Sequence, residues 1–154
     1  MLFSQKTERT RFAKFLVVGA ISSVIDFGFM NLFLSVFKLP LIISQAFSFI
    51  IAVLGSFMMN RFWIYRDSRS RNPFIQLTQF VLINLVGIGI RSILIPLFHK
   101  LFLPVLINIF NWDDKIITLF SQNLSLAIVI GIVLLWNFFA NRYWTYSDVK
   151  IGTG

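Results

Sequence analysis

Long apolar runs separated by short polar segments form the pattern of this chain. A helix rises about 1.5 Å per residue and a hydrocarbon core is about 30 Å thick, so each run is long enough, or nearly so, to cross a membrane. We therefore predict an all-α membrane protein, a single membrane domain over residues 1–154, with four transmembrane helices at about 12–37, 41–60, 74–98 and 116–140.

The polar segments predict where the helices turn. Lys38-Leu39-Pro40 forms a short turn between the first two runs, and residues 66–73 form a polar connector before the third. Residues 99–115 are mixed, and the apolar stretch Leu101–Phe110 within them is too short to span a membrane. We expect this stretch to lie along the membrane interface.

A short motif occurs twice, each time at the end of an apolar run. Asn60–Asp67 reads NRFWIYRD and Asn141–Asp148 reads NRYWTYSD, with five of the eight positions identical. This repetition predicts two copies of one two-helix unit, at about residues 11–67 and 74–148. Because each unit contains two spans, the two repeats would run parallel, related by an axis along the membrane normal.

The composition supports a membrane protein. Hydrophobic residues make up 57% of the chain and charged residues 13%, which is more apolar surface than a soluble domain of 154 residues can bury. The net charge of +8 does not indicate nucleic acid, because the basic residues flank apolar runs and form no nucleic-acid-binding motif. Anionic lipids are the better partner for them.

The basic residues are distributed unevenly between the two ends of the spans. The ends that carry the motifs and both termini have ten Lys or Arg residues, whereas the opposite ends have three, Lys38, Lys100 and Lys115. By the positive-inside rule, the motifs and the N- and C-termini are expected to be cytoplasmic. Lys115, just before the fourth run, is either an interface anchor or a phosphate contact on the outer side.

Two charged residues lie inside apolar runs, Asp26 in the first and Arg91 in the third, and alignment of the repeats places them at equivalent positions. A charge at that depth costs at least about 2.5–3.5 kcal/mol, so each should be paired or functional. Two interpretations stay open. The residues form a structural salt bridge, or Arg91 binds an anionic group during transport and Asp26 is its charge partner in the empty protein.

The motif residues either anchor the helix ends at the membrane interface or bind a substrate. Trp and Tyr are typical of membrane interfaces, and a cation complements the dipole at the end of a helix. The same Asn and Asp at the same spacing twice favour a further role, in which Arg61 and Arg142 bind phosphate. The path of a sugar would then be lined by Asn60, Asn137, Asn141, Trp63, Trp144, Tyr65, Tyr146 and Ser56.

The sequence gives little indication of an enzyme. The chain has no cysteine, and its single histidine, His99, has no partners for a metal site or a catalytic triad. No acid, base and nucleophile occur at a recognisable spacing. We expect no catalytic residue, no metal and no cofactor.

The chain resembles the GtrA-like family over about residues 11–148. The resemblance rests on Arg11–Gly19 (RFAKFLVVG) before an Asp-containing first run, on Ser56–Tyr65 (SFMMNRFWIY) and on Asn137–Tyr146 (NFFANRYWTY). It implies a small four-helix protein of the bacterial cytoplasmic (inner) membrane, linked to the synthesis of cell-surface polysaccharide or teichoic acid. It also implies importance for the matching positions Ser56, Asn60, Arg91, Lys115 and Asn137.

From the resemblance we expect a flippase that moves a polyprenyl-phosphate-linked monosaccharide, for example on undecaprenyl phosphate, from the cytoplasmic to the outer leaflet. Membrane glycosyltransferases would be its partners. Four helices can hardly enclose a path wide enough for a sugar, so assembly into a homo-oligomer remains an alternative to the monomer. One alternative is an anchor that recruits a glycosyltransferase and transports nothing. Another is a small cation exporter, which the basic cytoplasmic motifs fit less well.

Overall fold

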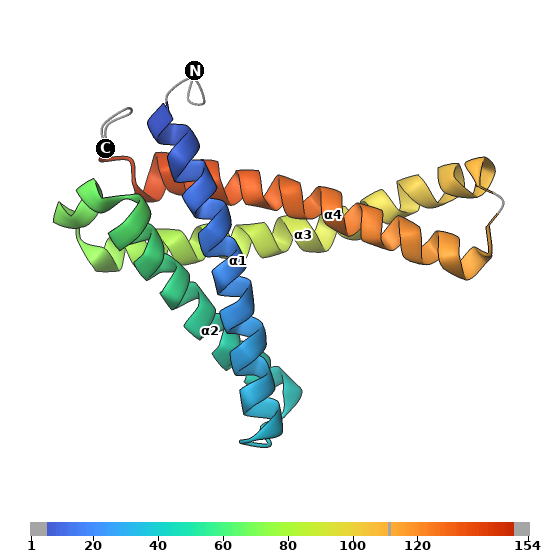
Figure 1. The fold of residues 1–154 in the computed structure, drawn as a ribbon, viewed down its shortest axis with the longest axis horizontal. Helices are drawn as coiled ribbons and strands as arrows, with labels where there is room; N and C mark the ends of the chain where they lie inside the picture. The colour runs from blue at the N-terminus through green and yellow to red at the C-terminus, as the bar shows by residue number, and fades with distance from the viewer. Residues whose placement is uncertain (1–5, 111, 150–154) are drawn as a thin grey trace. The chain divides into compact units, whose positions relative to one another are not determined.

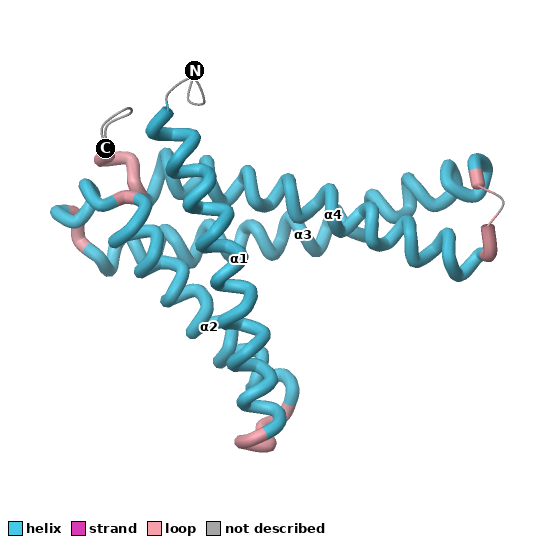
Figure 2. Tube along the Cα trace, in the orientation of Figure 1, coloured by secondary structure: helices cyan, strands magenta, loops and turns pink. Residues whose placement is uncertain are grey.

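The computed structural model describes residues 6–110 and 112–149 (Figure 1). These residues form helices joined by short loops and no strands (Figure 2). Four of the helices are long and apolar enough to cross a membrane. They are α1 (Lys6–Ser35), α2 (Leu41–Met59), α3 (Pro73–Ile109) and α4 (Asp114–Ala140). For the described residues, the prediction of an all-α protein with four helices that can span a membrane is confirmed.

Small side chains bring α1 and α2 together. The Ser22 hydroxyl donates to the carbonyl of Ala52 at 3.0 Å, and the Ser48 hydroxyl donates to Oδ1 of Asp26 at 2.6 Å. Gly55 lies against the end of the Ile25 side chain, where a Cβ would be 3.7 Å from Cδ1. The carboxyl group of Asp26 is therefore bonded by a side chain of the neighbouring helix.

The third helix does not end near residue 98. It continues through Pro96 and Pro104 to Ile109, so Leu101–Ile109 extends the same helix. That this stretch lies along the membrane interface stays a prediction. A proline removes one backbone hydrogen bond, and membrane helices tolerate it because neighbouring groups satisfy the freed carbonyl. At about 1.5 Å per residue, α3 is about 55 Å long and extends well beyond a hydrocarbon core of about 30 Å.

Both copies of the motif fold into a π-helical turn. The two turns, η2 (Asn60–Ile64) and η4 (Asn141–Thr145), continue directly from α2 and α4. In the first, the backbone N–H of Tyr65 donates to the carbonyl of Asn60, five residues earlier, at 2.8 Å. A π turn inside or at the end of an α-helix is rare and is often found at functional sites.

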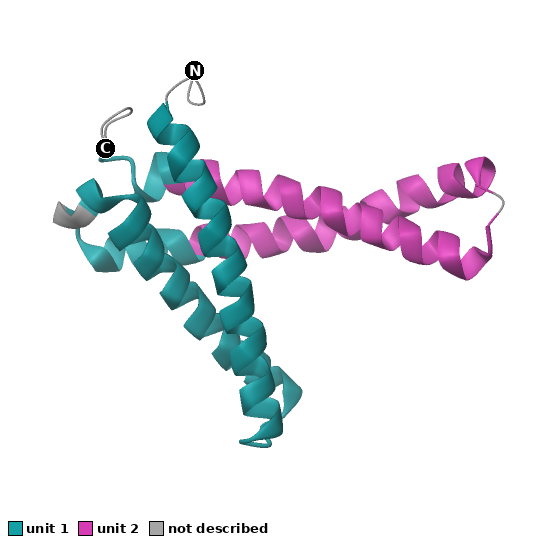
Figure 3. Cartoon of the chain, viewed as in Figure 1, with its two compact units in different colours: residues 1–81, 142–154 teal, residues 82–141 magenta. Residues whose placement is uncertain are grey.

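The chain divides into two compact units (Figure 3). The first is Met1–Val81 with Arg142–Gly154, and the second is Leu82–Asn141. The core of the first unit is formed by Val18, Ile64, Tyr65, Tyr146 and Val149, so it gathers around the two motifs. The second unit contains α4 and the part of α3 that follows Val81, and in it Nε1 of Trp136 donates to the carbonyl of Ile83 at 3.2 Å. The boundaries of the sequence repeats stay a prediction.

Candidate functional site

A buried carboxylate joins the first helix to the second motif. Glu8, near the start of α1, has no exposed surface. Nη1 of Arg11 donates to its Oε1 at 2.6 Å, and Arg142 donates from Nε to Oε2 and from Nη2 to Oε1, both at 3.2 Å. Nη1 of Arg142 also donates to the carbonyl of Tyr146 at 3.1 Å. Both oxygens of Glu8 are engaged, and the guanidinium group of Arg142 is held in place.

The arginine of the first motif, Arg61, is likewise bound by residues at and just before the start of α3. Nη1 of Arg61 donates to Oε1 of Gln76, and Nη2 of Arg61 donates to the carbonyl of Arg71 at 3.0 Å. Gln76 is fully buried, and its Nε2 donates onward to the hydroxyl of Ser68 and to the carbonyl of Thr145 at 3.3 Å. The carboxamide of Gln76 therefore connects the first motif and the second.

The arginine of each motif binds a residue from the other half of the sequence. Arg61 of the first motif binds the start of α3, and Arg142 of the second motif binds the start of α1. We call the five residues of this network, Glu8, Arg11, Arg61, Gln76 and Arg142, the motif clasp. Because the clasp joins segments up to 134 positions apart, it fixes both helix ends in one cluster.

Arg71 reinforces the cluster from the connector before α3. Its Nη1 donates to the carbonyls of Trp144 and Thr145 at 3.1 and 3.2 Å and lies 3.1 Å from the hydroxyl of Ser147. Carbonyls at the end of a helix lack intrahelical donors, and a cation there also complements the helix dipole. Arg71 therefore stabilises the end of the π turn that carries the second motif.

The two motif tyrosines form the apolar centre of the cluster. The rings of Tyr65 and Tyr146 stack with centroids 4.2 Å apart and an interplanar angle of 14°, and neither side chain is exposed. Their hydroxyls are buried without a hydrogen-bond partner in the part of the chain that the structure describes. Burial raises the pKa of the Tyr65 and Tyr146 hydroxyls well above the ordinary value, so both stay neutral.

Replacing either tyrosine with phenylalanine is expected to leave the melting temperature unchanged or to raise it by about 2–4 °C. The reason is that an unpaired buried hydroxyl costs free energy, and about 1 kcal/mol corresponds to that shift in a chain of this size. Thermal unfolding of Tyr65→Phe and Tyr146→Phe in detergent micelles measures it. A drop of several degrees would contradict the prediction and would mean that each hydroxyl binds a water molecule or a ligand.

The asparagines of the motif point back along their own helices. Nδ2 of Asn60 donates to the carbonyl of Ser56, and Nδ2 of Asn141 donates to the carbonyl of Asn137, each at 2.8 Å. Both asparagines are fully buried. This identical bond satisfies a carbonyl next to each π turn, so the structure gives Asn60, Asn141 and the backbone of Ser56 a structural role.

The tryptophans of the motif differ in exposure. Nζ of Lys14 lies 5.5 Å from the ring centroid of Trp63, a distance typical of a cation–π contact, and Trp63 is half-buried. Trp144 is 47% exposed. Trp144 is therefore the more exposed of the two rings, whereas one face of Trp63 is engaged by a cation.

The remaining predicted residues lie outside the clasp. Asn137, in the α3–α4 unit, has a buried Oδ1 with no partner in the described part of the chain, 3.1 Å from where a Cβ on Gly87 would lie. Arg91 belongs to the same unit, is exposed on α3, and pairs with no carboxylate among the described residues of that unit. Lys115 is exposed in the first turn of α4. Asp26 and Arg91 belong to different units, so their pairing stays a prediction.

Sequence reasoning missed three residues of this cluster, Glu8, Gln76 and Arg71. Glu8 carried a signal, because it is the single glutamate in the chain and lies in a segment that is otherwise basic. Gln76 occupies the position of Arg11 when the repeats are aligned as Phe15 with Phe80. Arg71 looks like one of several arginines in a polar connector, and nothing in its spacing indicates its contacts with the second motif.

The four apolar helices define a multi-pass membrane protein with a buried polar cluster at the ends that carry the motifs. In the described residues, no group of three or more His, Asp or Glu side chains lies close enough to bind a metal ion. Two guanidinium groups that sequence reasoning assigned to phosphate, those of Arg61 and Arg142, are at most 6% exposed and are occupied by the clasp. Capture of phosphate by them requires these contacts to open.

Residues 14–146 match the family described as the GtrA/DPMS transmembrane domain, and the chain belongs to this family. The resemblance found in the sequence is confirmed. The chain is also similar to the uncharacterized membrane protein YngA of Bacillus subtilis strain 168, with 26% identity over 135 residues, which cover 88% of this chain and 78% of YngA. The family is linked to the handling of polyprenyl-phosphate sugars, and its members are generally non-catalytic.

Proposed function

We propose that the protein is a flippase that moves a polyprenyl-phosphate-linked monosaccharide from the cytoplasmic to the outer leaflet of a bacterial inner membrane. The observation that carries this proposal is Arg91, an exposed cation in the apolar helix α3 of a chain whose family handles such lipids. A guanidinium group in hydrocarbon needs an anionic partner, and its planar set of donors fits the oxygens of a phosphate.

The first step is attraction of the lipid phosphate to the motif side, which the excess of Lys and Arg makes the cytoplasmic side. Lys6 and Arg66 are exposed there, and a basic residue near an anionic surface contributes about 1 kcal/mol. Arg61 and Arg142 hold the clasp together in this mechanism. They thereby fix the ends of the two motifs.

The second step moves the charge through the apolar region as a pair. Arg91 takes the phosphate, and Asp26, which is held by Ser48, is its partner when the site is empty. The polyprenyl chain stays in lipid while the sugar passes the exposed ring of Trp144 and the carboxamide of Asn137. Lys115, at the opposite end of α4 from the motif, receives the phosphate. The gradient of the substrate itself drives the transfer.

Recruitment of a glycosyltransferase is the second candidate. Phe62 and Tyr143 occupy the same position in the two motifs and are 49% and 56% exposed, so the motif end presents large aromatic side chains. Aromatic residues are enriched in protein–protein interfaces.

Transfer of a lipid-linked sugar in vesicles distinguishes these candidates. We expect the purified protein, reconstituted without nucleotide or an ion gradient, to move labelled polyprenyl-phosphate glucose, galactose or mannose until half is accessible in each leaflet. The rate should rise with the number of protein molecules per vesicle. Transfer of all three lipids at the rate of protein-free vesicles would contradict the flippase and favour recruitment.

A further inference from the structure

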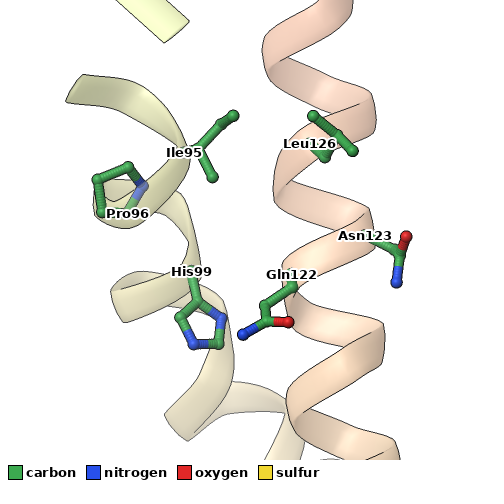
Figure 4. A pocket seen from close by; sticks show the side chains of 6 residues that line it. All are labelled: Ile95, Pro96, His99, Gln122, Asn123 and Leu126. Atoms are coloured by element: carbon green, nitrogen blue, oxygen red, sulfur yellow. The ribbon is translucent and has the colours of Figure 1, made fainter. Parts of the chain in front are cut away.

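A cavity of about 490 Å³ lies between α3 and α4 in the second unit (Figure 4). It is lined by Ile95, Pro96, His99, Gln122, Asn123 and Leu126. The volume lies in the range of small-molecule sites, about 300–1,000 Å³. A small number of polar groups on a mainly apolar lining is typical of a small-molecule site, and His99, Gln122 and Asn123 are the polar groups here.

The polar lining can both donate and accept hydrogen bonds. Nδ1 of His99 bonds the hydroxyl of Ser121 at 2.9 Å, which fixes the imidazole and leaves Nε2 for a ligand. Gln122, an exposed carboxamide beside His99, presents both a carbonyl and an amino group (Figure 4). Asn123 donates from Nδ2 to the carbonyl of Leu119 at 2.7 Å, which leaves its Oδ1 as an acceptor.

The remaining lining is apolar, and the six residues include no carboxylate, ammonium or guanidinium group. A phosphate would find no strong cation here. A sugar fits better, because its hydroxyls both donate and accept while its C–H faces match Ile95, Pro96 and Leu126.

The cavity lies toward the ends of α3 and α4 that are remote from the motifs. His99 is 26 residues after Pro73, the first residue of α3, which corresponds to about 39 Å along the helix. A hydrocarbon core is about 30 Å thick, so His99 is at or beyond its far boundary.

We propose that the His99 cavity binds the sugar of the lipid-linked substrate once it has crossed, and that His99, Gln122 and Asn123 determine which sugar is accepted. This inference rests on the proposed function, because the sugar that the cavity binds is the sugar of the lipid that the flippase would move. The phosphate then lies outside the cavity.

Protection of a single cysteine tests the cavity without transport, since the natural chain has no cysteine. Leu126→Cys places a thiol in the lining and keeps all three polar side chains. In detergent micelles, polyprenyl-phosphate glucose, galactose or mannose should slow its reaction with a small water-soluble maleimide at least threefold for the accepted sugar. Polyprenyl phosphate without sugar should not slow it. Asp114→Cys, exposed at the start of α4, is the matched control and should react equally with and without each lipid.

Adding Gln122→Leu to Leu126→Cys should remove the protection and leave the reaction without lipid unchanged. The proposal is overturned if the sugar-bearing and sugar-free lipids protect equally, if no sugar lipid protects, if Gln122→Leu keeps full protection, or if the thiol never reacts, which would show a cavity closed to water. None of these results depends on transfer between leaflets. Failure of the cavity and failure of the flippase are therefore distinguishable.

Discussion

Replacing Glu8 with alanine is expected to lower the free energy of unfolding by about 3–5 kcal/mol. Glu8 is fully buried and receives hydrogen bonds from two guanidinium groups, those of Arg11 and Arg142. Removing one partner of a buried ion pair leaves the other charge uncompensated, and the cost of that is in this range. Reversible unfolding of Glu8→Ala and wild type in mixed micelles, followed by circular dichroism, measures the difference.

Asp67→Ala is the matched control, because Asp67 also lies near Arg11. Its carboxylate is 3.8 Å from Nη2 of Arg11 and its side chain is 58% exposed, so we expect a loss of no more than about 1 kcal/mol. If Glu8→Ala were as stable as Asp67→Ala, the clasp would not hold the two motifs together. Glu8→Gln keeps the shape of the side chain and should fall between them.

The four spans could be predicted because lipid exposure requires long apolar runs, and these are local in the sequence. The helix ends could not be predicted as well. Helical hydrogen bonding continues into polar residues at the start of α1, which begins at Lys6 rather than near residue 12. It also continues through Pro96 and Pro104 in α3. Hydropathy indicates where lipid contacts a helix and does not indicate where its hydrogen bonds stop.

The repetition of the motif was visible in the sequence, and its folding was not. The equal spacing of Asn60 and Asn141 from the ends of their runs indicated equivalent places, and both form π turns with the same side-chain bond. The partners of Arg61 and Arg142 come from other helices, and Glu8 is 134 positions away from Arg142. The spacing of residues within a motif does not indicate such contacts. The sequence alone therefore does not distinguish an arginine in a structural ion pair from an arginine that binds phosphate.

Replacing Arg91 with alanine is expected to slow the transfer of a polyprenyl-phosphate sugar about 100-fold. An unpaired charge inside a membrane costs at least about 2.5–3.5 kcal/mol, and each 1.36 kcal/mol in the barrier is a factor of ten in rate. Arg91→Lys keeps the charge but loses the planar pair of donors, so it should retain part of the rate. Arg66→Ala, an exposed change on the motif side, should alter the rate only a few-fold.

The central claim is that the lipid phosphate crosses the membrane paired with Arg91. The most direct measurement compares, in one set of vesicles, the initial transfer rates of polyprenyl-phosphate glucose and of a neutral polyprenyl glucoside without phosphate, for wild type and for folded Arg91→Ala. We predict that the substitution slows the phosphate-bearing lipid about 100-fold and leaves the neutral lipid within a few-fold of wild type. Equal rates for the phosphate-bearing lipid in both proteins would contradict the claim and leave Arg91 a structural residue.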